Sequence, residues 1–272
     1  GVQTCALPIS KELEEQVNVI DTSDIVKYSP DTMTRKRYIG DRNAIIETRT
    51  ASVTTSAHSL VYADGILISN LLGNGYAYPS RWNMVMPEEL KRVDFFFGPF
   101  SAAYGGSSVG TTVLMTTNMP DRLTLGAKAQ AFNESFGYLG HRGTYQGTGV
   151  SGLVGDLTAF GLSWVLGADR LESHGHPMTY AVLGAPTTCT GSCLGSTPAV
   201  TGTSSYVDPY GKIQTAIGGQ SLDHTIQDTF KLKLEQSVGS LKLRYTLGSW
   251  RNHSDNRAQS WLTDAEIGRA HV

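Results

Sequence analysis

From residue 123 onward, hydrophobic and polar positions alternate along the chain in several separate runs. In the first run, 123–132, leucine and alanine occupy the odd positions, and the even positions are mostly polar. Further runs cover 143–153, 159–166, 230–235 and 241–247. A period of two predicts β-strands with one apolar and one polar face, because successive side chains of a strand point to opposite sides.

Short connections alternate with longer ones between these predicted strands. Gly155-Asp156 and the segment 237–240 predict tight turns, whereas the connections at about 133–142 and 170–225 are longer. Outer-membrane β-barrels have strands of about ten alternating residues, short periplasmic turns and longer external loops. The pattern therefore predicts antiparallel strands of a transmembrane β-barrel. They are too few to close it, since an open edge would leave backbone groups unpaired in lipid.

The part of the chain before residue 121 predicts a small mixed domain of short strands and helical turns. Asp21 to Asp24 offer an N-cap for a helical turn over 25–28, which Ser29-Pro30 should end. The strands are expected at 17–20, 44–49, 58–62, 93–97 and 111–117.

Both ends of the chain read as sequence foreign to these domains. Residues 1–10 and 266–272 resemble translated sequencing adapters, and we exclude them as artefacts from the analysis of the fold. We accordingly expect an internal piece of a longer reading frame, so that a missing signal peptide carries no information. The predicted organisation is a small domain over 11–120 and barrel strands over 121–265, with a long external loop at about 170–225.

Composition and charge exclude some classes of protein. The net charge is −2 and charged residues make up 17 % of the chain, which gives no reason to expect a nucleic-acid partner. No run of about 18 apolar residues is present, so the sequence predicts no transmembrane helix.

Two motifs of the first part carry a family resemblance. A strand ends in Asp64-Gly65, and a strand containing Arg92-Val93 leads into a glycine-rich turn. Their order and spacing resemble the plug domain of TonB-dependent outer-membrane receptors. Lys91, Asp94 and Gly40-Asp41-Arg42 depart from the usual pattern. The matching positions, to which we assign a structural role in the plug, are Asp64, Gly65, Arg92, Val93, Gly98, Pro99, Ser101, Tyr104, Gly105 and Gly110.

The resemblance implies an α+β plug domain followed by antiparallel strands of an incomplete transmembrane β-barrel. It also implies an active importer in the outer membrane of a Gram-negative bacterium, in contact with membrane lipid. Its partners would be TonB with the inner-membrane energising complex, acting through an N-terminal segment that this chain lacks. The ligand would be a small molecule or metal chelate, with iron-siderophores the commonest choice in the family. No cofactor is expected.

A polar interface between plug and barrel wall is expected, because such a plug must be remodelled to open a path. The charged residues that we expect to face lumen-lining polar side chains are Arg35, Lys36, Arg37, Arg42, Glu47 and Arg49.

The loop 71–82, rich in glycine and aromatic residues, is a candidate for ligand contact, as apical plug loops are in the resembling family. Its side chains are suited to stacking on a large polar ligand or pairing with its charge. Packing of the aromatic residues against the barrel wall is the open alternative. The candidates are Tyr76, Tyr78, Arg81 and Trp82.

Cys189 and Cys193 lie in the predicted long loop. The outer surface of a bacterium permits disulfides, and we expect these two cysteines to close a small turn. Metal ligation together with His174 and His176 is the alternative, although the spacing matches no common zinc site. We expect no metal site.

The sequence offers no catalytic motif. It contains no nucleophile elbow and no His-Glu-x-x-His, and the glycine-rich segment 105–111 lacks the lysine of a phosphate-binding loop. We therefore expect a protein that is not an enzyme. The alternatives to an importer are a passive porin or adhesin with a similar barrel, which would not require the plug motifs, and a secreted soluble β-protein such as a carbohydrate hydrolase. The hydrolase would need a pair of carboxylates across a cleft.

Overall fold

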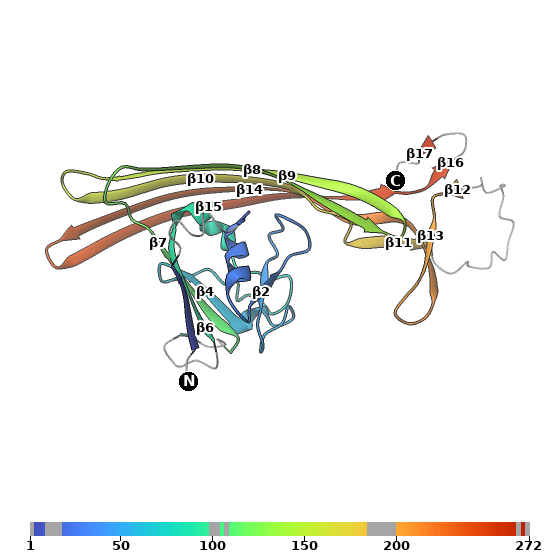
Figure 1. The fold of residues 1–272 in the computed structure, drawn as a ribbon, viewed down its shortest axis with the longest axis horizontal. Coiled ribbons are helices and arrows are strands. Elements are labelled where there is room, and N and C mark those ends of the chain that lie inside the picture. Colours follow the sequence, from blue (N-terminus) through green and yellow to red (C-terminus); the bar gives the residue numbers. More distant parts are fainter. Residues whose placement is uncertain are drawn as a thin grey trace.

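The computed structural model describes residues 3–8, 18–97, 104–105, 109–183, 200–264 and 268–269. A small domain, residues 18–117, packs against one face of a long, gently bowed antiparallel sheet, which we call the wall sheet (Figure 1). Among the strands that the structure describes, the wall sheet does not close on itself. Within the described ranges, no helix is long and apolar enough to cross a membrane.

The small domain is built on a five-stranded sheet with the order β1-β6-β7-β4-β5. The pairs are antiparallel except for β4 and β7, which run parallel. Residues of the adapter-like N-terminal segment form edge strand β1, which the sequence analysis did not foresee. A separate ribbon pairs β2 with β3. The bounds are β1 Gln3–Pro8, β2 Met33–Arg35, β3 Ile45–Glu47, β4 Ser59–Ala63, β5 Ile66–Leu67, β6 Leu90–Phe97 and β7 Thr111–Thr117.

One apolar core lies on this sheet. Val61, Phe95 and Val113 come from the three central strands and are fully buried. Ile25 and Val26 of one 3-10 turn and Trp82 of another complete the core. The 3-10 turns of the described residues are η1 Thr22–Tyr28, η2 Ser56–His58, η3 Trp82–Met84 and η4 Pro87–Glu89. The helical turn predicted after Asp21 is confirmed and ends at Ser29. The strand predicted at 17–20 is wrong for the described residues 18–20, which form no strand.

The wall sheet has the order β11-β14-β10-β9-β8, with β13 and β15 also paired to β14. All of its pairs are antiparallel, as predicted. The bounds are β8 Thr124–Tyr138, β9 His141–Leu157, β10 Leu162–His174, β11 Thr179–Leu183, β13 Ser204–Val207, β14 Ile213–Val238 and β15 Leu241–Ser260. A small separate sheet joins β12 Val200–Thr201, β16 Thr263–Asp264 and β17 Gly268–Arg269.

The alternation of the sequence separates the two faces of the wall sheet. On β10, Val165 and Leu171 are 2 % exposed, whereas Leu166 between them is 37 % exposed and points away from the small domain. On β8, Leu125 is 72 % exposed, while Lys128 and Gln130 reach back to backbone carbonyls of the small domain. The apolar stripe therefore faces outward and the polar stripe faces the small domain.

The strands are longer than predicted, and several connections lie elsewhere. The loop predicted at about 133–142 is a two-residue hairpin turn at Leu139-Gly140, with φ values of 52° and 80°. Gly155-Asp156 lies within β9, and the turn follows at 158–161. The irregular stretch predicted at 170–225 is shorter, because β10 and β14 extend into it. In these extensions the strands still pair, but their residues are mostly polar and show no alternation of apolar and polar positions.

Two carboxylates and one lysine anchor η1 in the small domain. Asp21 caps the turn, and Asp24 accepts from the Asp21 backbone N–H at 3.2 Å. The Lys36 Nζ lies 2.6 Å from Asp21 and 2.9 Å from Asp24. Burial alone would raise the pKa of Asp24, but the charges and hydrogen bonds of Lys36 and Lys27 lower it from 3.8 to about 2.

We expect Lys36→Met to destabilise the small domain by about 3 kcal/mol at neutral pH, because it removes the buried countercharge of two carboxylates. Arg49→Met is the control, since the ion pair of Arg49 with Asp31 is exposed. Urea unfolding, followed by Trp82 fluorescence in a protein whose other tryptophans are phenylalanine, measures both. Equal midpoints for the two variants would contradict this expectation.

The same pair predicts a dependence on pH. The folded protein binds the Asp24 proton more weakly than the unfolded chain does, since the pKa of Asp24 is about 2 in the fold against 3.8 otherwise. The stabilisation is therefore present above about pH 4 and is lost as the pH falls towards 2. Urea midpoints at pH 7, 4 and 2 should show this loss in the wild type and a smaller one in Lys36→Met.

Candidate functional site

The surface between the small domain and the wall sheet is polar. Because side chains alternate along a strand, every second residue of β14 points at the small domain. These residues are buried, and most of them bond to it directly or through a neighbouring side chain. They are Asp223, Thr225, Gln227, Thr229, Lys231 and Lys233.

Two lysines of β14 form buried ion pairs across this surface. The Lys233 Nζ is fully buried, lies 2.9 Å from an Asp64 carboxylate oxygen and also donates to the Thr117 hydroxyl. The Lys231 Nζ lies 2.5 Å from the Glu89 carboxylate, whose side chain is 1 % exposed. Removing a single partner of such a pair would leave a buried charge without its counterion.

The Asp64-Gly65 turn positions the carboxylate of the first pair. Asp64 and Gly65 have φ values of 48° and 83°, which fit the tight hairpin turn between β4 and β5. The carboxylate also accepts from the Thr117 backbone N–H at 2.9 Å. Burial would raise the pKa of Asp64, but the hydrogen bonds from Lys233 and Thr117 outweigh it and hold this pKa below its usual value. The sequence analysis predicted the turn but missed the ion pair.

A second group of contacts holds the loop 37–41 against the wall sheet. The Arg37 guanidinium pairs with Asp41 at 2.8 Å and lies 3.4 Å from Asp223 of β14. The Tyr38 hydroxyl donates to the same Asp223 carboxylate at 3.3 Å. The Gly40 carbonyl accepts from the Gln227 amide at 3.0 Å.

Gly40 is required at this contact by its conformation and by its neighbour. Its φ is +82°, and a β-carbon there would lie 2.8 Å from the β-carbon of Ser173. The Ser173 hydroxyl donates to the carbonyl of Ile39. The loop backbone therefore touches the wall directly.

The predicted charged set meets the wall only in part. Arg37 contacts Asp223 as expected, whereas Lys36 pairs inside the small domain and Arg49 pairs with Asp31 at its surface. Arg35 and Arg42 are exposed. Glu47 accepts from the Val53 backbone N–H at 3.2 Å. The prediction was wrong for Lys36, which is held inside the small domain. In the described part of the wall, the principal charged partners come from turns, at Asp64 and Glu89.

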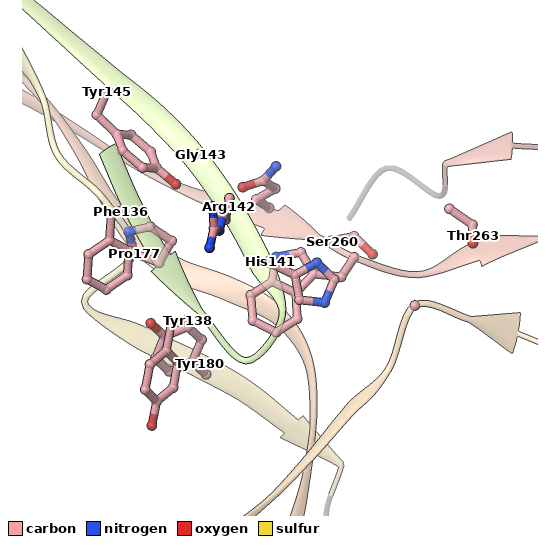
Figure 2. Close-up of a pocket in the computed structure, with 13 residues that line it drawn as sticks. Phe136, Tyr138, His141, Arg142, Gly143, Tyr145, Pro177, Tyr180, Ser260 and Thr263 are labelled. Carbon is pink, nitrogen blue, oxygen red and sulfur yellow. The ribbon is translucent and has the colours of Figure 1, made fainter. Parts of the chain in front are cut away.

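An aromatic pocket of about 250 Å³ lies at the end of the wall sheet where the β8–β9 hairpin, β11 and the end of β15 meet (Figure 2). The His141 and Trp261 rings stack with centroids 3.9 Å apart, and Tyr138 stacks on Tyr180 at 4.8 Å. Arg142 adds a positive charge. The lining residues are Phe136, Tyr138, His141, Arg142, Gly143, Tyr145, Pro177, Tyr180, Gly202, Gln259, Ser260, Trp261 and Thr263.

The aromatic pocket is connected to the small domain through His176. The His176 ring stacks on Phe136 with centroids 3.9 Å apart and meets Tyr38 edge-on at 6.5 Å. Tyr38 in turn bonds to Asp223 of β14. His176 and Tyr38 therefore form a row of packed side chains between the pocket and the contact of domain and wall.

The loop candidates for ligand contact lie apart from this pocket, and none of them is among its described lining residues. Tyr76 is 72 % exposed, and Tyr78 packs over Gly73. The Arg81 guanidinium lies 5.4 Å from the Trp250 ring of β15, which fits the alternative of packing against the wall. Trp82 is 2 % exposed in the core, and its indole N–H donates to the Ala44 carbonyl, so the interpretation of Trp82 as a ligand contact is wrong.

The remaining motif positions lie in or beside the small-domain sheet. Val93 is in the core, and Arg92 pairs with Asp94 at 2.7 Å. The Tyr104 ring lies beside those of Tyr62 and Phe96, with Gly105 following it. A β-carbon at Gly110 would lie 2.7 Å from that of Ala51. The positions outside the described residues are Gly98, Pro99 and Ser101.

Cys189 and Cys193 also lie outside the described residues. Of the two histidines proposed as their alternative partners, His174 is exposed at the end of β10 and stacks on His224. His176 instead packs on Phe136, which lines the aromatic pocket. The two rings therefore point to different surroundings and do not form one ligand pair.

The aromatic pocket and the buried lysines were not predicted as site residues. Lys231 and Lys233 alternate with Phe230, Leu232 and Leu234 in the sequence. Lysine on the polar face of a barrel strand points into the lumen, so this alternation was the available signal. The pocket joins residues more than a hundred positions apart and left no local pattern.

We expect Lys233→Met to weaken the attachment of the small domain by about 3–5 kcal/mol, because it leaves Asp64 buried without a countercharge. Adding Asp64→Asn should recover part of the loss, since asparagine tolerates the turn conformation and still accepts from Thr117. Brief proteolysis in increasing urea measures the attachment of each variant. If the double variant lost as much stability as the two single variants together, the result would contradict the ion pair. Lys242→Met, which removes an exposed lysine of β15, is the control.

Gly40→Ala and Gly65→Ala form a matched pair. Both glycines have φ values near +80°, but a β-carbon at Gly65 meets nothing within 4 Å. Alanine at either position should therefore strain the backbone to a similar extent. Only alanine at position 40 should also clash with Ser173. We expect Gly40→Ala to loosen the domain by about 1–3 kcal/mol more than Gly65→Ala in the same proteolysis assay. Equal effects would show that the loop does not press on the wall.

Comparison with known proteins finds a family match for the first part of the chain and a similar fold for most of it. Residues 9–112 match the family described as TonB-dependent Receptor Plug Domain. No curated protein sequence matches the chain. A mutant ferric enterobactin receptor (PfeA) from Pseudomonas aeruginosa, in complex with enterobactin, superposes with a TM-score of 0.59 and 15 % identity. Another mutant of that receptor gives a TM-score of 0.61 and 14 % identity.

These alignments cover 93 % of this chain and 33 % of the matched structures, so the chain spans about a third of the length of those receptors. At this identity the likeness shows the fold, which is an α+β plug followed by antiparallel strands of an incomplete β-barrel. The plug of the family corresponds to the small domain, which we call the plug from here on. The family match thus covers the plug, and the superposed receptors share with this chain both the plug and its packing on an antiparallel sheet.

Proposed function

We propose that the chain forms the plug, 11–120, and the first barrel strands, 121–265, of an active importer in the Gram-negative outer membrane. The observation that carries this proposal is the polar contact between plug and wall, in which β14 holds the plug by the ion pairs Lys231–Glu89 and Lys233–Asp64. A passive porin has no need of a plug fixed in this way.

Such a contact suits a plug that must be displaced and then return. Charged and hydrogen-bonded groups can exchange their partners for water when they are pulled apart, whereas an apolar interface would expose surface that water does not solvate. TonB, energised by the inner-membrane complex, would supply the work by pulling on a segment that precedes the plug. The motif residues Arg92, Val93, Gly105 and Gly110 keep the plug folded during this step.

The substrate that fits the aromatic pocket is a flat, anionic aromatic chelate. Stacked rings offer faces for further stacking, and the Arg142 guanidinium offers a charge to an anionic group. The structural neighbour is described as a ferric enterobactin receptor and was solved with enterobactin. We assign the substrate to the same chemical class, a ferric siderophore with aromatic iron-binding groups.

The pocket end of the wall sheet would face the outside. The opposite end carries the connections at 158–161 and 239–240 and the link from β7 to β8. These short turns suit the periplasmic side. Tyr76 and Tyr78 on the plug remain candidates for a later contact, and a disulfide between Cys189 and Cys193 would close a turn in the external loop.

We expect Trp261→Ala and Tyr180→Ala in the full-length protein each to weaken the binding of ferric enterobactin by up to about tenfold, because each removes one stacking face. Tyr245→Ala is the control, since Tyr245 lies on the outward face of the sheet and is 55 % exposed. Equilibrium binding of the iron complex to protein in detergent measures the three affinities.

Measuring the uptake of the iron complex by cells distinguishes an active importer from a passive barrel. Cells that carry the full-length protein should take up the iron complex only when TonB is present. Uptake that continues in cells without TonB would contradict the proposed function, and wild-type affinity in both pocket variants would overturn the assignment of the pocket.

A further inference from the structure

Three metal-ligating side chains gather on the face of the wall sheet that points away from the plug. His174 and His224 are register partners across β10 and β14, and their rings stack with centroids 4.2 Å apart. Glu172 lies two residues before His174 and therefore on the same face. The donor atoms of these three residues all lie within 4.8 Å of one another.

The hydrogen bonds of the two histidines leave a lone pair free on each ring. The His174 Nδ1 lies 3.1 Å from the carbonyl oxygen of Gln146, which can only accept, so Nδ1 carries the proton and Nε2 is free. The His224 Nε2 lies 2.8 Å from the Glu172 carboxylate, which leaves Nδ1 of His224 free in the neutral ring. This bond uses one oxygen of the Glu172 carboxylate, so the other oxygen can bind an ion.

The cluster lies beyond the apolar band of the outward face. Along β10 this face reads Leu162, Trp164, Leu166 and Ala168, and then turns polar. The first polar step is an ion pair between Arg170 and Asp228, at 3.3 Å. Glu172 and His174 are the next two residues of this face along β10, further from the apolar band. The three ligands thus lie where water and dissolved ions can reach them.

A negatively charged group on the neighbouring strand β15 faces the cluster and should increase its affinity for a cation. Asp255 of β15 is the register partner of His224, and its carboxylate lies 3.7 Å from the ring of His253. On the other side, Thr148 of β9 is the partner of Glu172 and carries no charge. The nearest positive side chain along β10, Arg170, is already paired with Asp228.

We propose that Glu172, His174 and His224 form a binding site for a divalent transition-metal ion such as Zn²⁺ or Cu²⁺. Two imidazoles and one carboxylate are the ligand set that such ions prefer, whereas Mg²⁺ and Ca²⁺ prefer oxygen ligands alone. Three protein ligands leave a fourth position open to water or another external ligand. The bound ion would also link β10 to β14. The site is separate from the aromatic pocket and does not depend on which ligand is imported.

Copper binding to the full-length protein in detergent tests the site directly, without any siderophore present. We expect one Cu²⁺ ion to bind with an electron paramagnetic resonance spectrum that shows two coordinated nitrogens, and a large excess of Zn²⁺ to compete with it, because Cu²⁺ binds such ligands more tightly. His174→Gln and His224→Gln should each weaken binding about tenfold or more and leave one nitrogen. Glu172→Gln should weaken binding but keep both nitrogens.

His253→Gln is the matched control, because His253 lies on the same face of the neighbouring strand and outside the three-residue cluster. It should keep the wild-type affinity and spectrum. The substituted side chains lie on the outer face, so the circular dichroism of each variant should match the wild type. A two-nitrogen spectrum that survives in the double variant His174→Gln/His224→Gln would overturn the proposal, as would its loss in His253→Gln.

Discussion

The ion pair between Lys233 of the wall and Asp64 of the plug is the contact on which the rest of the arrangement depends. Both side chains are buried, at 0 % and 8 % exposure, so each charge requires the other to stay ionised out of water. The Lys231–Glu89 pair repeats the arrangement one step along the strand. The plug is therefore attached at defined points and not by a continuous apolar surface.

This attachment explains why the two parts are built differently. The plug keeps its own apolar core around Val61, Phe95 and Val113, so it can leave the wall without exposing that core. The wall sheet sends most of its apolar residues outward, so the side chains that meet the plug are mainly polar, with a few apolar ones such as Val165 and Leu171 among them. Hydrogen bonds to backbone carbonyls, such as Gln227 to Gly40, fix the position of the plug at low cost in stability.

The sequence predicted the elements whose chemistry is local. The cap at Asp21, the Asp64-Gly65 turn and the alternation along β8, β10, β14 and β15 all follow from neighbouring residues. The full length of β10 and β14 was not predicted, because pairing at the ends of these strands depends on the partner strand and not on apolar alternation. Trp82 was misassigned because an aromatic residue in a loop looks the same whether it faces a ligand or the core. The aromatic pocket depends on contacts between distant segments, such as His141 with Trp261.

Native-state hydrogen exchange of the full-length protein in lipid, read by mass spectrometry over a range of urea, tests the central claim most directly. The claim is that the plug is held by separable polar contacts on a wall that stands without it. It predicts that the amides of β4 and β7 become exchangeable at lower urea than those of β10 and β14, which stay protected. Simultaneous exposure of plug and wall at one urea concentration would contradict it, because the two would then form a single cooperative unit.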